Sequence, residues 1–122
     1  MDFQFTAEEE RFRAEVRAFL ASRLPEGWDI QSFLAGADSP ERLALAADIT
    51  KQLADREWLA MAWPREYGGQ DAPHMQQTIF NEETTYRAMP GGGGVGASSA
   101  GPALMMYGSE EQKRLYLAHH RR

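Results

Sequence analysis

The sequence contains no cysteine among its 122 residues, which excludes disulfide bridges, thiolate nucleophiles and cysteine-ligated metal centres. It also lacks a long hydrophobic run. The stretch WLAMAW (58–63) is far shorter than the roughly 20 apolar residues that cross a bilayer. The N-terminal stretch MDFQFTAEEERFR is acidic where a secretory signal would be basic and then apolar. We therefore expect a cytoplasmic protein with no membrane association.

Positive charge is also scarce, because 13 Lys and Arg residues face 18 Asp and Glu residues, for a formal net charge of −5. Such a chain offers no general attraction to nucleic-acid phosphates, so nucleic acid is not an expected partner. Hydrophobic residues make up 43% of the sequence and charged residues 25%, which is typical of a globular chain. The length corresponds to one domain over residues 1–122.

No segment alternates apolar and polar residues for long enough to predict a strand, whereas helix signals recur. Thr6 and Glu9 have the spacing of a capping box, which predicts a helix that begins there and ends near Pro25. On that helix Arg13 is expected on the wetter side. The expected apolar stripe consists of Phe12, Val16, Phe19 and Leu20.

Two longer helices are predicted in the middle of the chain. After a loop over residues 26–38, Ser39 and Pro40 predict a helix start, and a third helix is expected over about residues 73–88. The second helix should bury Leu43, Ala46, Ala47, Thr50 and Leu53. The third should place Met75, Ile79 and Tyr86 near one face. The aromatic side chains of the turn between these helices, Trp58, Trp63 and Tyr67, are expected in the core.

A fourth helix is predicted to end near Gly108, and Ser109 with Gln112 forms a second capping box that opens a short fifth helix. The predicted fold is therefore all-α, with about five helices in an orthogonal or bundle-like array.

The segment MPGGGGVGASSAGPALMMYG (89–108) contains four consecutive glycines. Gly91, Gly93 and Gly96 fit the pattern G-x-G-x-x-G, but that pattern binds dinucleotides only where a strand delivers the loop to a helix. Here a predicted helix precedes it, which argues against a nucleotide site. Two interpretations stay open: a flexible connection between helices, or a small-residue segment over 94–101 that lets another backbone or a ligand approach closely.

Other candidates for chemistry are weaker. Glu82 and Glu83 point about 100° apart on a helix, so they suit a solvated or salt-bridged face better than shared acid–base work. His74 has no second histidine at a ligand spacing, so we expect an exposed side chain and no metal site. Ser98 and Ser99 lack the G-x-S-x-G setting of a nucleophile.

The order of four segments resembles the amino-terminal helical domain of the acyl-CoA dehydrogenases. The segments are FTAEEERFRAEVRAFL, WLAMAWPREYGGQDAP, NEETTYRAM and GPALMMYGSEEQKRLYL, which together cover nearly the whole chain. The most specific pieces are WPREYGG (63–69) and GSEEQK (108–113).

The resemblance implies an FAD enzyme that removes the α and β hydrogens of an acyl-CoA thioester. In such enzymes a carboxylate takes the α proton, the β hydrogen leaves as hydride to the flavin, and the electrons pass to an electron-transferring flavoprotein. They resemble one another in having a helical domain, a β-domain and a C-terminal helical bundle, and in forming homo-oligomers. The flavin and the base belong mainly to the two later domains.

The resemblance therefore implies that this chain holds no catalytic residue, and that in isolation it is inactive and does not bind FAD. At LYLAHHRR (115–122) the sequence departs from the family's continuation into the β-domain, which favours a fragment. The alternatives are a small subunit of a split dehydrogenase and a non-catalytic interaction module. For the module, Met105, Met106 and Tyr107 would form an exposed face, although core packing is the ordinary expectation for them.

The resemblance also assigns the glycine-rich segment to the wall and floor of the acyl-chain pocket. The positions implied are Gly94, Val95, Ser98, Ser99 and Pro102. Small side chains leave room for a bulky, branched or ring-bearing acyl group, an effect of roughly 1–3 kcal/mol per methylene. Packing against a neighbouring helix would explain the same small residues.

Overall fold

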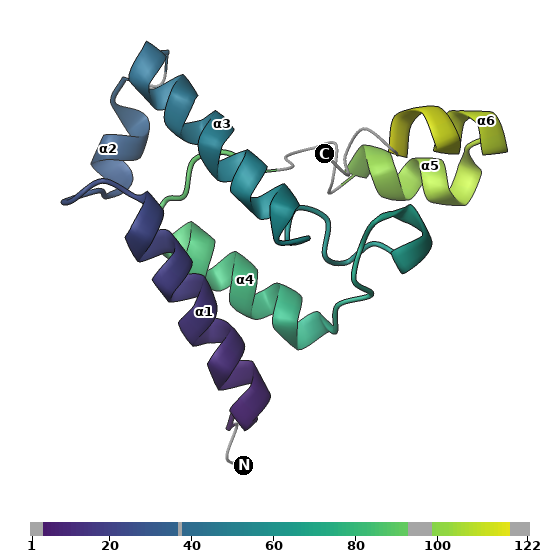
Figure 1. The fold of residues 1–122 in the computed structure, drawn as a ribbon, viewed down its shortest axis with the longest axis horizontal. Coiled ribbons are helices and arrows are strands. Elements are labelled where there is room, and N and C mark those ends of the chain that lie inside the picture. Colours follow the sequence, from purple (N-terminus) through teal and green to yellow (C-terminus); the bar gives the residue numbers. More distant parts are fainter. Residues whose placement is uncertain (1–3, 37, 93–98, 118–122) are drawn as a thin grey trace. The chain divides into compact units, whose positions relative to one another are not determined.

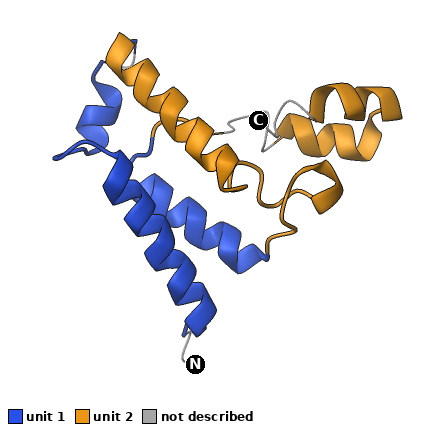
Figure 2. Cartoon of the chain, in the orientation of Figure 1, with its two compact units in different colours: residues 1–39, 73–89 blue, residues 40–72, 90–122 orange. Residues whose placement is uncertain are grey.

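A computed structural model describes residues 4–36, 38–92 and 99–117 of the chain. These residues form helices, turns and loops without a strand, which confirms the predicted all-α class (Figure 1). The chain divides into two compact units (Figure 2): residues 1–39 with 73–89 form unit 1, and residues 40–72 with 90–122 form unit 2. No helix of the described residues is long and apolar enough to span a membrane.

Unit 1 is built on two packed helices, α1 (Ala7–Arg23) and α4 (His74–Tyr86), with the short helix α2 (Ile30–Leu34) beside them (Figure 1). The predicted capping box opens α1, because Glu9 N donates to Thr6 Oγ1 at 3.1 Å and Thr6 N donates to Glu9 Oε1 at 2.9 Å. The apolar stripe is confirmed at Val16, Phe19 and Leu20, which are buried, whereas Phe12 is half-buried.

Helix α2 lies inside the stretch that was expected to be a loop. Its start is another capping box, in which Ser32 N donates to Asp29 Oδ1 at 2.8 Å. The preceding Trp28 donates from its indole Nε1 to the carbonyl oxygen of Ala88 at 3.0 Å, which joins this region to the end of α4. The spacing of Asp29 and Ser32 was the overlooked signal.

The buried face of α4 differs from the prediction. Ile79 is fully buried as expected, but Met75 is 46% exposed and Tyr86 is 86% exposed. The neighbouring buried positions are Glu83 and Thr84. The prediction was wrong because it assigned buried positions to apolar residues alone. On α1 the same reasoning wrongly put Arg13, which is 8% exposed, on the wetter side.

Unit 2 begins with α3 (Pro40–Asp55), whose predicted start at Pro40 is confirmed. Its buried residues are Ile49 and Leu53, whereas Leu43 and Ala47, expected to be buried, are exposed. The predictions for Ala46, Thr50 and Leu53 are confirmed, since these residues are half-buried or buried. The observed stripe follows Arg42, Leu45, Ala46, Ile49, Thr50 and Leu53, all buried or half-buried.

The rest of unit 2 contains the 3₁₀ turn η1 (Arg65–Tyr67), α5 (Gly101–Tyr107), α6 (Glu110–Gln112) and the π-helical turn η3 (Lys113–Leu117). The predicted capping box of Ser109 and Gln112 opens α6. Trp58 and Trp63 are buried as predicted, and Tyr67 is half-buried.

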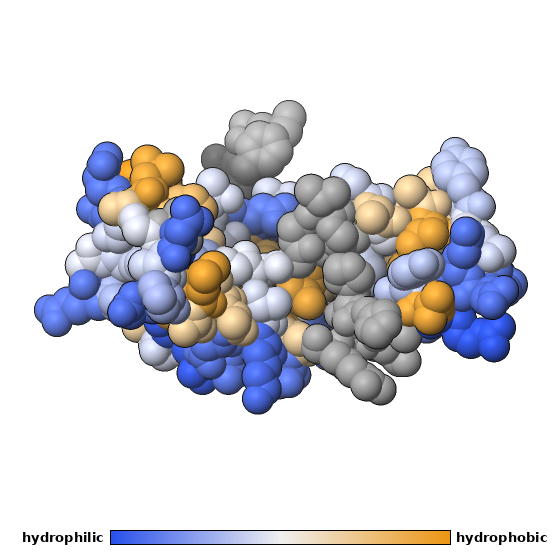
Figure 3. Space-filling model, turned by 90° about the horizontal axis from the view of Figure 1, so that it is seen from above, coloured by the Kyte–Doolittle hydropathy of each residue, from blue (hydrophilic) through white to orange (hydrophobic). Residues whose placement is uncertain are grey.

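Some apolar side chains of the described residues stay on the surface, where orange areas lie among hydrophilic blue ones on the face drawn in Figure 3. Met106 is 72% exposed and Tyr107 is 83% exposed, so core packing is wrong for both, whereas Met105 is half-buried. Helix α5 contacts η3, but this contact does not bury Met106 or Tyr107.

Candidate functional site

Within unit 2, the start of the glycine-rich segment lies against α3. Gly91 has a φ of +86°, a left-handed conformation that favours glycine. A Cβ atom at Gly91 would lie 2.5 Å from the carbonyl oxygen of Ala46 and 2.8 Å from the Thr50 hydroxyl. The Thr50 Oγ1 accepts a hydrogen bond from Gly92 N at 2.9 Å and donates one to the Ala46 carbonyl oxygen at 2.7 Å. The segment therefore begins on the α3 backbone, at a point where no side chain fits.

A second close contact within unit 2 is made by Gly101, the first residue of α5. Gly101 is buried, and a Cβ atom there would collide with the Trp63 ring atoms Cζ2, Cη2 and Cε2. The sequence left open what approaches the small-residue stretch closely. At Gly101 the indole ring of Trp63 is what approaches closely, because the α5 backbone lies directly against it.

Trp63 is itself held by the loop that carries the motif WPREYGG. The backbone N–H of Trp63 donates to the Ala60 carbonyl oxygen at 3.0 Å, and the backbone carbonyl oxygen of Trp63 accepts from Asp71 N at 3.0 Å. A Cβ atom at Gly69 would collide with that same carbonyl group, so only glycine lets the loop close here. With 3% of its surface exposed, Trp63 is a fixed part of the core of unit 2.

The predicted pocket residues are placed only in part. Gly94, Val95 and Ser98 lie outside the described residues. Ser99 is exposed just before α5, and Pro102 is half-buried in its first turn. Thr50, which holds the start of the segment, was seen in the sequence only as a core position of α3.

Each unit also contains an open cavity. In unit 2 a cavity of about 390 Å³ lies beside the motif loop and includes Trp63, Tyr67 and Gly69 in its lining. In unit 1 a cavity of about 570 Å³ lies between the start of α1 and that of α4, with Phe12 and Met75 in its lining. Of the predicted pocket residues that the structure describes, neither Ser99 nor Pro102 is among the described lining residues of these two cavities.

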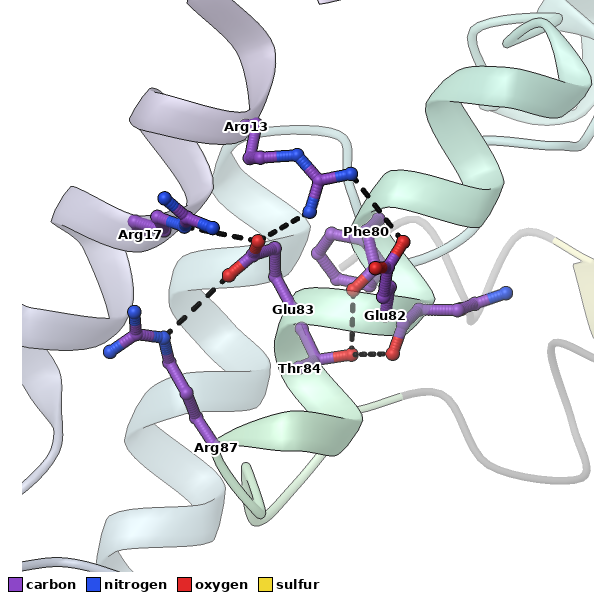
Figure 4. Close-up of polar contacts among 8 residues, drawn as sticks. Arg13, Arg17, Phe80, Glu82, Glu83, Thr84 and Arg87 are labelled. Atoms are coloured by element: carbon purple, nitrogen blue, oxygen red, sulfur yellow. Dashed lines mark hydrogen bonds and ion pairs between the residues drawn. The ribbon is translucent and has the colours of Figure 1, made fainter. Parts of the chain in front are cut away.

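A cluster of charged side chains joins α1 to α4 in unit 1 (Figure 4). The carboxylate of Glu83 accepts from Arg13 Nη1 at 2.5 Å and from Arg17 Nε at 3.0 Å, and Arg87 Nε lies 3.7 Å from its other oxygen. Glu82 Oε2 lies 3.4 Å from Arg13 Nη2. The salt-bridged alternative for this glutamate pair is confirmed, and for Glu83, 4% exposed, the solvated alternative is wrong.

These contacts keep Glu83 ionised. Burial opposes the charge and would raise the pKa of Glu83, but hydrogen bonds from Arg17 and Arg13, with their positive charges, outweigh it and lower that pKa below its ordinary value. The hydrogen bond to Glu83 raises the pKa of Arg13 despite the opposing effect of burial. A carboxylate with a lowered pKa and three arginine partners is poorly suited to act as a general base.

Two patterns considered in the sequence, a dinucleotide loop and a metal cluster, can be compared with the described residues. The glycine segment follows helix α4 and not a strand, so the dinucleotide pattern lacks the structural setting that makes it bind phosphate. Within the described ranges, no three His, Asp or Glu side chains gather in a way that could hold a metal. His74 is exposed at the start of α4, as expected.

Comparison with known proteins relates the chain to the acyl-CoA dehydrogenases. A family model described as acyl-CoA dehydrogenase, N-terminal domain, matches residues 6–121. The acyl-CoA dehydrogenase FadE26 of Mycobacterium tuberculosis is 32% identical over 118 residues, which cover 96% of this chain and 29% of that protein.

Solved structures match as well. The ChsE4-ChsE5 complex from Mycobacterium tuberculosis aligns with a TM-score of 0.74 and 31% identity over 99% of this chain and 30% of that chain. The Tcur3481-Tcur3483 steroid ACAD aligns with a TM-score of 0.80 and 31% identity, again over 99% of this chain and 30% of that chain. The chain thus spans about three-tenths of the length of these relatives.

Proposed function

This chain belongs to the acyl-CoA dehydrogenase family, of which it is an N-terminal domain, and we propose on this basis that it forms part of the acyl-chain pocket of an FAD-dependent dehydrogenase acting on acyl-CoA thioesters. The pocket residues we propose are Gly94, Val95, Ser98, Ser99 and Pro102.

The observation that supports this role is the way both ends of the glycine-rich segment are held on unit 2. Gly91 and Gly92 lie on α3 through Thr50, and Gly101 lies on Trp63. A pocket wall must keep its position if it is to select substrates by shape. Exposed Ser99 and half-buried Pro102 lie next to the second contact, where their surfaces are free to face an acyl group.

The substrate we propose is a CoA thioester with a bulky, ring-bearing acyl group. Two of the similar solved structures are described as steroid ACADs, at 31% identity. The small side chains between residues 94 and 99 are consistent with a wide pocket.

We assign the reacting groups to parts of the enzyme other than this chain. In the complete enzyme, bound FAD would supply the acceptor for the β hydrogen of the substrate, and its electrons would go to an electron-transferring flavoprotein. Glu83 is buried among arginines in unit 1 and does not serve as the base. We therefore propose that the isolated chain neither holds FAD nor dehydrogenates acyl-CoA, and that the chain supplies shape to the pocket.

The partners we propose are the remaining dehydrogenase domains, in the same polypeptide or in a second subunit, within an oligomer. The similar structures are complexes of two named proteins, ChsE4 with ChsE5 and Tcur3481 with Tcur3483. A cytoplasmic enzyme fits the cysteine-free composition.

The test uses the intact protein that carries this chain, together with any subunit that co-purifies with it. FAD and a set of acyl-CoA thioesters, from octanoyl-CoA to a steroid carboxylate thioester, are added, and bleaching of the flavin absorbance is followed. Bleaching by the ring-bearing thioester is the expected result. A protein that never binds FAD, or binds it and is bleached by no acyl-CoA, contradicts the proposal and favours the interaction module.

A further inference from the structure

We infer that Trp63 is a positioning residue for substrate specificity: its indole ring supports Gly101 and so sets how far the first turn of α5, with Pro102, projects into the acyl pocket. This inference rests on the proposed function. It concerns a residue that lies in another loop, far from the pocket residues in the sequence.

The first argument is that α5 meets Trp63 through a residue without a side chain. Among the seven residues of α5, Gly101 is the buried one. Ser99 and Ala100, just before it, are exposed, and Pro102 is half-buried. The buried side of this turn thus faces the indole ring, and the more exposed side carries the proposed pocket residues.

The second argument is that the ring cannot easily yield. Trp63 is 3% exposed, and its backbone is hydrogen-bonded on both sides, to Ala60 and to Asp71. Gly69 packs against its carbonyl group, which limits movement of the backbone as well. Protein interiors transmit such steric strain because they are close-packed. A change in the size of the side chain at position 63 or 101 must therefore move α5.

Two substitutions test this: one adds atoms between α5 and the indole ring, and the other removes them. Gly101→Ala places a methyl group where the ring atoms of Trp63 lie, so α5 must move away from the ring and narrow the pocket. Trp63→Phe removes one ring of the indole and lets α5 settle closer. The double variant should bring α5 back toward its original position, because the added and removed atoms occupy the same space.

The experiment measures kcat and KM of the intact holoenzyme for a steroid carboxylate CoA thioester and for octanoyl-CoA. The quantity compared is kcat/KM for the steroid thioester divided by kcat/KM for octanoyl-CoA. Gly101→Ala should lower this ratio about tenfold, mainly by raising the KM for the steroid thioester. Trp63→Phe should raise that ratio, and the double variant should recover most of the loss. Trp58→Phe, the same change at another buried tryptophan of unit 2, is the control and should leave the ratio unchanged.

The outcomes separate this inference from the proposed function. A wild-type holoenzyme that oxidises neither thioester overturns the proposed function, and this inference with it. With an active wild-type enzyme, two results overturn this inference alone. One is that Gly101→Ala lowers both kcat/KM values equally, and the other is that adding Trp63→Phe to Gly101→Ala does not restore the ratio. If Gly101→Ala does not fold, an unchanged ratio in Trp63→Phe overturns it as well.

Discussion

In unit 1, long charged side chains reach from α1 to α4 and meet at Glu83. In unit 2, the close contacts form where side chains are missing, at Gly69, Gly91 and Gly101. The first kind of contact is lost when atoms are removed, and the second when atoms are added. The proposed pocket segment depends on the glycine contacts. Its shape should therefore be sensitive to substitutions that add atoms, which an alanine scan of larger side chains would not include.

The largest effect is expected from adding one methyl group in unit 2. Gly69→Ala would drive a Cβ atom into the backbone of Trp63, and should lower the free energy of local opening of this loop by more than about 3 kcal/mol. Amide hydrogen exchange of residues 60–72 in the intact protein measures this. The control is Gly27→Ala, which meets no atom within 4 Å and should cost only about 1 kcal/mol for its φ of +75°. Equal costs would contradict the steric argument.

Next in size is the removal of atoms in unit 1. Glu83→Ala leaves Arg13 buried without its main partner, and should lower the free energy of opening of α1 by about 3 kcal/mol. Hydrogen exchange of α1 and α4 measures the change. Glu82→Ala is the matched control, because the Glu82 side chain is 61% exposed, and it should cost about 0.5 kcal/mol. If both variants lose the same amount, the buried pair contributes nothing special.

A smaller, pH-dependent effect follows from the lowered pKa of Glu83. Because its folded pKa lies below the ordinary value of 4.5, the ion pairs stabilise unit 1 fully above that pH and lose their effect as the pH falls through the folded pKa. The stability difference between wild type and Glu83→Gln should therefore be constant near neutral pH and shrink in acid. A difference that stays constant down to the acid unfolding of the protein would refute this assignment.

The smallest effect is expected where unit 2 uses a side chain to hold the glycine segment. Thr50→Val keeps the shape of residue 50 but leaves Gly92 N without its acceptor, which should cost about 1–2 kcal/mol. Thr50→Ser retains the hydroxyl group and should be close to wild type. The readout is exchange of the Gly92 amide, and equal protection in both variants would show that the hydrogen bond is unimportant.

Helix ends were predicted more reliably than buried faces. Thr6, Pro40 and Ser109 begin helices as predicted, because caps depend on groups within four residues of one another. Arg13 was wrongly placed on the wetter side and the burial of Glu83 was not predicted, since burial of a charge depends on a partner about seventy positions away that local periodicity does not reveal. On α3 the prediction differs from the structure at Leu43, which is exposed, and it did not include the buried Ile49.

For the candidate site, the sequence by itself determined that small residues crowd positions 91–101 and that the segment order matches the acyl-CoA dehydrogenase N-terminal domain. It also identified Trp63 as a core residue. Only the tertiary structure decided that Gly101 lies on Trp63 and that Gly91 and Gly92 lie on Ala46 and Thr50. The reason is physical: a glycine in a sequence shows that space is needed, but the atoms that fill that space come from elsewhere in the fold.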